Sequence, residues 1–395
     1  MKNILIFSSL LLSTVAFSCS DGSLDTPEIQ KNYATTISLS DKNATAETKA
    51  LYSNLWKLQI DNKVLFGHHD DLIYGRTWMT LPGRSDTKDV VGDFPGIYSV
   101  DFSEIMDDRS ATSTLNAHRL RTVKEARARG EVITACAHLN NPLTGGDSWD
   151  NKPGTVTAIL NSGSPTNLKF KVWLDKLALF ANDLKDENGK LIPVIFRPFH
   201  EHTQSWSWWG SSATSEAEFI QLWKFTIDYL KNTKGVHNFI YAISPQLDII
   251  GTKESFLYRW PGDDYVDFIG TDSYHGTNTS AFSSNLRNLG QLSREKGKPC
   301  GVTETGVEGI RDGSGKALTR YWTDEIGTPI ENKGVALVIT WRNAYDPQNN
   351  GHHYFSTFSG EASATNFVKF YDMPHILFSK DLPKMYQMAE QITVQ

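Results

Sequence analysis

The segment LIPVIFRPFHE, Leu191 to Glu201, is an apolar run about one β-strand long that ends in charged residues. A near-continuous apolar run is typical of a parallel strand that other elements cover on both faces. Because side chains alternate along a strand, we expect Arg197, Phe199 and Glu201 to share one face. In a barrel, that face points inward.

Seven more segments share this pattern of an apolar start and a polar end. They are residues 63–70 (KVLFGHHD), 95–102 (PGIYSVDF), 131–142 (EVITACAHLNNP), 238–246 (NFIYAISPQ), 265–274 (YVDFIGTDSY), 298–306 (KPCGVTETG) and 335–343 (VALVITWRN). Helical periodicity falls between them, at 110–129, 168–186, 214–232 and 282–296. The helix at 214–232 is the clearest, because Ser215 and Glu218 have the spacing of a capping box.

Eight strands that alternate with helices predict the α/β class and, within it, a (β/α)8 TIM barrel with its active site at the C-terminal ends of the strands. A doubly wound open sheet is the main alternative. No glycine-rich phosphate-binding fingerprint follows the first strand, and polar endings recur on all eight strands instead of at one switch point. The barrel is therefore favoured.

The first residues resemble a bacterial lipoprotein signal. An apolar stretch after Lys2 is too short to span a membrane and ends at VAFSC, so residues 1–18 are expected to be cleaved and Cys19 lipidated. An ordinary signal peptide with an incidental cysteine is the alternative. The polar residues 19–44 predict a flexible tether, and no further linker interrupts residues 45–395, which we interpret as one catalytic domain.

Charge and cysteine content narrow the function classes. The net charge is −6 and no Lys/Arg-rich block occurs, so nothing indicates nucleic-acid binding, and a membrane contact is expected only through the N-terminal lipid. Cys136 and Cys300 lie in separate apolar strands, as buried free thiols do. No disulfide framework is expected.

Two glutamates end predicted strands, Glu201 on the fourth and Glu304 on the seventh. Paired carboxylates across one pocket are what glycoside hydrolysis requires, one to protonate the leaving oxygen and one to attack or to activate water. A rim salt bridge would explain either residue alone, but explains the pair less well. The sequence thus predicts Glu201 and Glu304 as catalytic residues.

Other polar side chains are expected around this pair. A guanidinium inside a barrel needs an ionised partner, which for Arg197 is expected to be Glu304. Asp272 and Tyr274 end the sixth strand on one face, where the phenol could hydrogen-bond a carboxylate on the seventh strand; packing at the rim is an equal alternative for Tyr274.

Tryptophans gather just beyond the fourth strand, in a segment that also contains Gln and Ser. Flat rings stack on the C–H faces of sugars, so Trp206, Trp208, Trp209 and Trp341 are candidates for a binding wall, although a lone tryptophan usually belongs to a core. The histidines of GHHD and His275 lack the spacing of a metal site, and no G-x-S-x-G nucleophile motif occurs. Neither metal nor cofactor is expected.

The motifs RPFHEHTQSWSWWG and GVTETG resemble glycoside hydrolase family 26, the β-mannanase family of retaining (β/α)8-barrel glycosidases, over about Asn62 to Asn343. The resemblance implies that Glu201 is the acid/base and Glu304 the nucleophile. It also implies substrate contacts, which together with those proposed above are His138, His200, Trp206, Trp209, Asp272, Tyr274, Trp341 and Arg197. His202 departs from the family pattern, in which Asn is common after the acid.

The resemblance implies a retaining endo-β-1,4-mannanase that acts on β-mannan or manno-oligosaccharides. Alternatives are an exo-acting mannobiohydrolase, a β-glucanase or β-xylanase of the same fold, and a non-catalytic glycan-binding lipoprotein. A monomer anchored in the bacterial envelope, in the outer membrane, is expected.

Overall fold

The computed structural model describes residues 33–395. The predicted signal peptide, the lipidation site Cys19 and residues 19–32 of the predicted tether lie outside the described residues. Within residues 33–395, no helix is long and apolar enough to cross a membrane.

Eight parallel strands close into a barrel, because β2 pairs with β3 on one side and with β9 on the other. The strands are β2 (Val64–His69), β3 (Ile97–Asp101), β4 (Val132–Cys136), β5 (Val194–Arg197), β6 (Phe239–Ile243), β7 (Phe268–Ser273), β8 (Cys300–Thr305) and β9 (Leu337–Thr340). Each falls within one of the eight predicted segments. The predicted (β/α)8 barrel is confirmed, and a short strand, β10 (Ile376–Leu377), adds beside β2.

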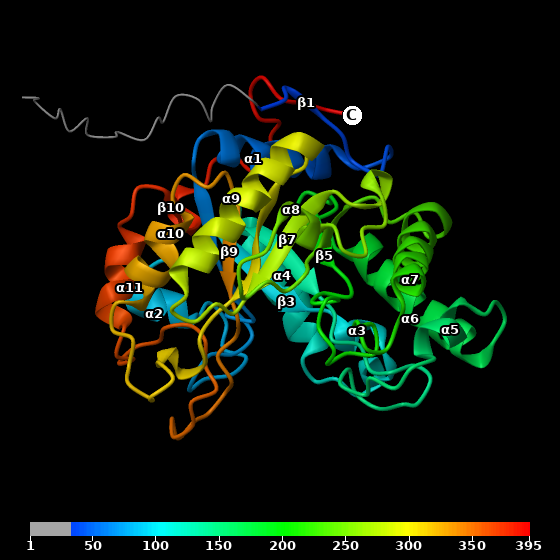
Figure 1. The fold of residues 1–395 in the computed structure, drawn as a ribbon, viewed down its shortest axis with the longest axis horizontal. Coiled ribbons are helices and arrows are strands. Elements are labelled where there is room, and N and C mark those ends of the chain that lie inside the picture. Colours follow the sequence, from blue (N-terminus) through cyan, green and yellow to red (C-terminus); the bar gives the residue numbers. More distant parts are fainter. Residues whose placement is uncertain (1–32) are drawn as a thin grey trace, which may run out of the picture. The chain divides into compact units, whose positions relative to one another are not determined.

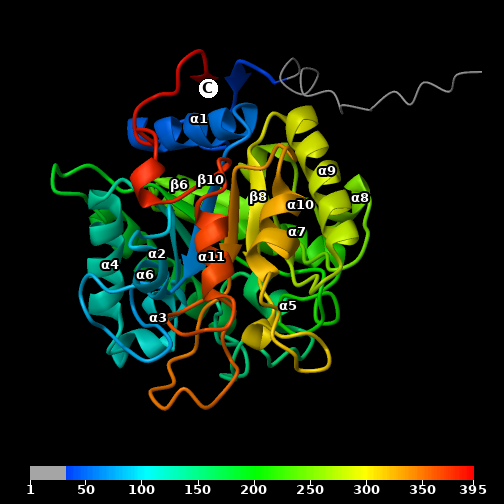
Figure 2. The same cartoon turned by 90° about the vertical axis from the view of Figure 1, so that its left-hand side faces the viewer.

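Helices surround the barrel (Figures 1 and 2). They are α1 (Ala46–Ile60), α2 (Asp86–Val91), α3 (Ser103–Met106), α4 (Asn116–Ala128), α5 (Thr155–Leu160), α6 (Pro165–Asp183), α7 (Glu216–Asp228), α8 (Lys253–Phe256), α9 (Thr279–Lys296), α10 (Thr328–Ile330) and α11 (Ala364–Tyr371). The predicted capping box starts α7, where Ser215 N–H donates to Glu218 Oε2 at 2.9 Å and Glu218 N–H to Ser215 Oγ at 3.3 Å.

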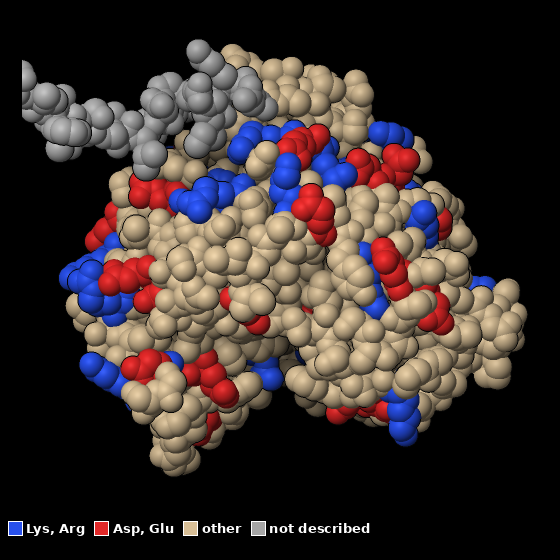
Figure 3. Space-filling view, viewed as in Figure 1, with Lys and Arg blue, Asp and Glu red and all other residues tan. Residues whose placement is uncertain are grey.

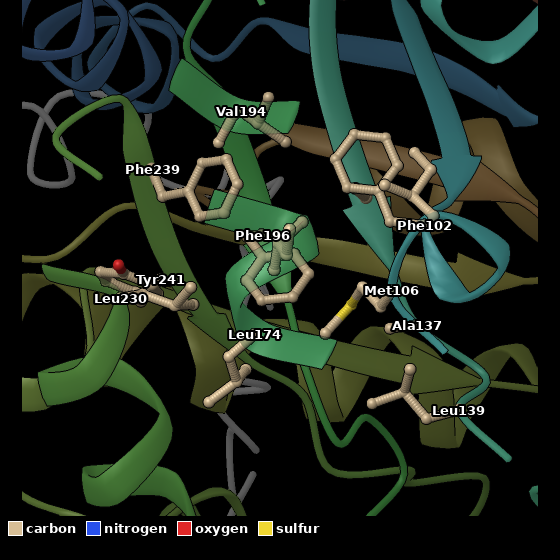
Figure 4. Packing of buried hydrophobic residues seen from close by; sticks show 14 of the residues in the cluster. Phe102, Met106, Ala137, Leu139, Leu174, Val194, Phe196, Leu230, Phe239 and Tyr241 are labelled. Carbon is tan, nitrogen blue, oxygen red and sulfur yellow. The ribbon is translucent and has the colours of Figure 1, made fainter. Parts of the chain in front are cut away.

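Apolar side chains fill two layers. Inside the barrel, Leu65, Ile195 and Ile240 are buried in one cluster with Leu55 of α1, so this helix covers the end of the barrel at which the strands begin. Outside it, α6 and α7 pack against β4 to β6, where Phe196 lies among other apolar side chains (Figure 4). Burial on both faces explains why the strands are apolar runs instead of alternating patterns.

The domain starts earlier than the predicted boundary at residue 45. Within residues 33–44, β1 (Thr36–Ile37) pairs with β11 (Thr393–Val394), and Leu39 is buried. Ser40 N–H donates to the buried Asp267 at 2.6 Å. The tether prediction is wrong for residues 33–44, because a partner strand more than 350 residues away in the sequence orders this polar segment.

Cys136 and Cys300 are buried free thiols, as predicted. Charged side chains of both signs intermix on the face of the molecule in Figure 3, and the surface is hollowed at the lower edge of that view.

Candidate active site

A cavity of about 660 Å³ opens where the barrel strands end. Each of the eight barrel strands contributes a lining side chain, either at its end or in the loop that follows it. Among the predicted site residues, the lining contains His138, Glu201, Trp206, Tyr274, Glu304 and Trp341. Both predicted catalytic carboxylates therefore face one pocket.

Glu201 reaches the cavity by a turn and not by strand alternation. β5 ends at Arg197, and both Phe199 (φ 50°) and Glu201 (φ 53°) adopt the left-handed conformation. Phe199 packs outward against Trp208, so the prediction that Phe199 shares an inward face with Glu201 is wrong. Non-glycine residues with positive φ carry strain that surrounding contacts must hold.

Glu304 accepts hydrogen bonds on both carboxylate oxygens. Arg197 Nη2 donates to Oε2 at 2.7 Å, and the Tyr274 hydroxyl donates to Oε1 at 2.5 Å. The predicted pairs of Glu304 with Arg197 and with Tyr274 are both confirmed. An unprotonated carboxylate has the lone pairs to accept both bonds and is the form that acts as a nucleophile.

Arg197 holds two carboxylates at once, because Nη1 also donates to Asp272 Oδ2 at 2.5 Å. Thr303 Oγ1 donates to the other Asp272 oxygen at 2.7 Å. Burial lowers the pKa of the Arg197 guanidinium, but Asp272 and Glu304 outweigh it and place that pKa above its ordinary value. Arg197 and Asp272 thus lie behind the cavity wall and hold Glu304 in place; neither lines the cavity.

Glu201 has the opposite environment. Burial, followed by the charges of Glu304 and Asp272, raises the pKa of Glu201 well above its ordinary value. Trp206 Nε1–H donates to Glu201 Oε2 at 2.7 Å and opposes this shift. A protonated carboxyl that faces an unprotonated one is the acid and nucleophile arrangement of a retaining glycosidase.

The predicted aromatic wall is partly corrected. Trp206 and Trp341 line the cavity, whereas Trp208 and Trp209 are fully buried. Trp209 packs edge-on against Trp206 at 5.2 Å between ring centroids, and its indole N–H donates to the His200 carbonyl at 2.8 Å. Trp209 therefore supports the wall from behind instead of contacting a sugar.

Two of the predicted histidines face each other. His138 lines the cavity, His200 lies behind it, and their Nε2 atoms are 3.0 Å apart. His138 Nδ1 is 2.7 Å from Asp101 Oδ2. Both ring nitrogens of His138 thus contact other protein side chains, and the face of its ring lines the cavity. His202 is buried against Phe219, away from the cavity.

Sequence reasoning missed several lining residues. Trp149 is 66% exposed and lies 4.9 Å from Trp206 between ring centroids. Asp70, Tyr74 and Arg342 also line the cavity, and the Tyr74 hydroxyl donates to Asp70 at 2.7 Å. A tryptophan in a polar loop, as in GGDSWDN, was the available signal for Trp149. Asp70 and Arg342 stand at the polar ends of the predicted strand segments 63–70 and 335–343, and Tyr74 lies in a loop without a motif.

The potential metal ligands fit hydrogen bonding better than a metal centre. Among the described residues, Asp101, Cys136 and His138 present ligand atoms within 4.8 Å of one another. The distance between Asp101 and His138 is that of a hydrogen bond, and burial raises the pKa of the Cys136 thiol well above its ordinary value. A thiolate ligand is therefore disfavoured at neutral pH.

A closed (β/α)8 barrel with this carboxyl pair at its strand ends defines a glycoside hydrolase. The model of Glycosyl hydrolase family 26 matches residues 40–312, and the chain belongs to that family.

Similar proteins agree with this assignment. A mannan endo-1,4-beta-mannosidase of Bifidobacterium adolescentis is 30% identical over 87% of this chain, which spans 36% of that relative's length. A GH26 β-mannanase structure from Bacteroides ovatus has 38% identity and a TM-score of 0.80, covering 88% of this chain and 98% of that one. A Cellulomonas fimi endo-β-1,4-mannanase structure has 31% identity and a TM-score of 0.81, covering 90% and 81%.

Proposed function

We propose that this protein is an endo-acting β-1,4-mannanase that works with retention of anomeric configuration. The observation that carries the proposal is the carboxyl pair, in which Glu201 is a buried acid and Glu304 accepts hydrogen bonds from Arg197 and Tyr274. The names of the relatives support mannan as the substrate. In the first step Glu304 attacks the anomeric carbon while Glu201 protonates the leaving oxygen; in the second, Glu201 deprotonates water that releases the sugar.

The wall of the cavity suits a neutral sugar chain. Trp206 and Trp341 offer flat rings on which sugar C–H faces stack, and carboxyl and histidine side chains lie between them. The cavity lining also includes Trp149, which packs on Trp206, and Asp70 and Tyr74 from the loop after β2. A lining that draws on several loops suits a sugar chain that is cut internally.

The test is hydrolysis of soluble β-mannan, β-glucan and xylan, with product sizes followed over time and fresh products examined by proton NMR. We expect a rapid spread of oligosaccharide sizes from mannan alone, with the β-anomer appearing first. Release of the α-anomer would contradict retention. Release of a single short product from the start would indicate exo action, and preferential cleavage of glucan or xylan would overturn the substrate.

We further propose that the protein is a monomeric envelope lipoprotein, held in the outer membrane by a lipid on Cys19. The sequence VAFSC supports this proposal. Metabolic labelling with a radioactive fatty acid should mark the wild-type chain but not Cys19→Ala, and membrane fractionation should release that variant. Labelling of the variant would contradict the anchor, and light scattering of the released chain tests the monomer.

A further inference from the structure

The turn that carries Glu201 is held through His200. This histidine lies between two left-handed residues, Phe199 and Glu201, so its contacts resist the relaxation of a strained backbone. The His200 ring contacts His138 through a 3.0 Å distance between their Nε2 atoms. Its ring also lies 5.7 Å from that of Trp206, which donates to Glu201. His200 thus connects the turn with the hydrogen-bond donor of the acid.

Asp101, at the end of β3, decides which nitrogens of this pair carry protons. Its Oδ1 accepts the Ser103 N–H at 2.7 Å, and its Oδ2 lies 2.7 Å from His138 Nδ1. Burial raises the pKa of Asp101, but the hydrogen bonds from His138 and Ser103 outweigh it and hold that pKa well below its ordinary value. A carboxylate can only accept, so His138 Nδ1 must carry a proton.

The tautomer of His200 follows from that of His138. In a neutral His138 with Nδ1 protonated, Nε2 is a bare acceptor, so the 3.0 Å contact requires His200 to donate from its own Nε2–H. Burial lowers the pKa of His200 well below its ordinary value, and the charge of Arg197 adds to this, so this ring stays neutral. Its Nδ1 then has no proton, which fits its lack of a hydrogen-bond partner within residues 33–395.

We propose that Asp101 is a positioning residue for the acid/base step. It fixes the tautomers of His138 and His200, and these two rings hold the turn that carries Glu201 and the Trp206 indole that donates to Glu201. The proposal rests on the proposed function of Glu201. Asp101 lines the cavity, but both of its oxygens already accept hydrogen bonds within the protein, so it acts through His138 and not on the reacting atoms. His138 also stacks on Trp206, with 5.9 Å between ring centroids and 24° between planes. A change in the hydrogen bond between His138 and His200 therefore also disturbs the Trp206 indole that donates to Glu201.

Asp101→Asn should reverse the tautomers of His138 and His200, although the new side chain has nearly the same shape as the old one. The amide oxygen keeps the Ser103 N–H, so the NH2 group takes the place of Oδ2 and points a donor at His138 Nδ1. His138 must then carry its proton on Nε2 and donate to His200, and His200 acquires a buried Nδ1–H with no acceptor. Replacing a carboxylate by an amide beside a catalytic histidine is known to select the wrong tautomer in this way.

Two measurements test the inference in the full chain. Long-range proton–nitrogen NMR of the 15N-histidine protein, with His138→Gln and His200→Gln for assignment, should show Nδ1–H for His138 and Nε2–H for His200, and the reverse in Asp101→Asn. For aryl β-mannobiosides, kcat/KM should change less than about threefold with a dinitrophenyl leaving group. With a phenyl leaving group, kcat/KM should fall about tenfold to hundredfold. This loss is a part of the ~10²–10⁴-fold rate increase that a positioned general acid contributes.

Ser99→Ala is the matched control, because Ser99 on the same strand hydrogen-bonds His69 at 2.8 Å in the same cavity. Its leaving-group dependence should match that of the wild-type enzyme. Unchanged tautomers in Asp101→Asn, or an equal loss on both aryl substrates, would overturn the inference. If Glu201→Ala kept its activity on mannan, the proposed function would fail instead, whereas the NMR result does not depend on catalysis.

Discussion

The indole N–H of Trp206 donates a 2.7 Å hydrogen bond to the Glu201 carboxyl, so the residue that forms the aromatic wall also tunes the proposed acid. The bond favours the ionised form and partly offsets the rise in the pKa of Glu201 that burial causes. One side chain thus contributes to both sugar binding and proton transfer.

Trp206→Phe should move the alkaline limb of the pH profile upward. Glu201 must be protonated for the first step, so kcat/KM falls as the pH rises through its pKa. Removing the N–H donor destabilises the carboxylate, which raises that pKa further and extends activity to higher pH. The measurement is the pH dependence of kcat/KM on mannan oligosaccharides, and a limb that stays in place or moves downward contradicts the role of the bond.

Trp206→Ala removes the ring as well as the donor. We expect kcat/KM to fall by about two orders of magnitude, because both binding and acid positioning are lost. The melting temperature should change little, since Trp206 lines the cavity instead of filling the core. A collapsed melting temperature, or near-wild-type kinetics, would return the residue to a structural role.

The two carboxyl groups should respond differently to leaving groups and anions. Glu201→Ala should form the glycosyl-enzyme from a dinitrophenyl mannobioside, since a good leaving group needs no proton, and then stall. Azide needs no base and should restart it, yielding a β-mannosyl azide. Glu304→Ala lacks the nucleophile, so azide could only occupy the vacated space and give the α-azide. The reverse pattern would exchange the two roles.

Trp149→Ala should weaken binding of long chains. Its ring is 66% exposed and packs on Trp206, so removal should raise KM for mannan about threefold to tenfold, the size of one aromatic contact. Leu143→Ala is the control, because Leu143 is an exposed residue of the same loop that does not line the cavity. Equal KM values for the two variants would place Trp149 outside the binding surface.

A chain that begins at Thr45 should be less stable than one that begins at Tyr33. It loses the β1–β11 pair and the Ser40 bonds to Asp267, which leaves a buried carboxylate with fewer partners at a cost of about 1–3 kcal/mol. We expect a melting temperature lower by roughly 2–10 °C in circular dichroism, with unchanged kcat at 25 °C. Equal melting curves would show that residues 33–44 contribute no stability.

The sequence predicted the barrel because its strands are locally distinct. Each strand has a covered apolar run and a polar end, and these two features need no knowledge of long-range contacts. The pairing of β1 with β11 was not predictable in this way, because two polar dipeptides at opposite ends of the chain have no periodicity to detect.

The site was predictable in residue type more than in placement. Glu304 enters the cavity after an irregularity in β8, where its pairing with β7 shifts register between Thr271 and Asp272, although its bonds to Arg197 and Tyr274 were foreseen. Glu201 enters the cavity because the backbone turns into the left-handed region, which non-glycine residues rarely adopt and no local pattern signals. Trp209 was misplaced because the spacing of the tryptophans does not show which indoles line the cavity and which pack behind it.

The β1–β11 pair also fixes how this enzyme can be attached to anything else. Residues 38–45 contact Asp267 and His237, which precede β7 and β6, so β1 and β11, with the C-terminus, lie at the end of the barrel where the strands begin (Figure 1), whereas the cavity opens where the strands end. A solid support or a second module joined next to β1 or after β11 would be attached at the end of the barrel away from the cavity, which would leave the cavity accessible to an insoluble polysaccharide.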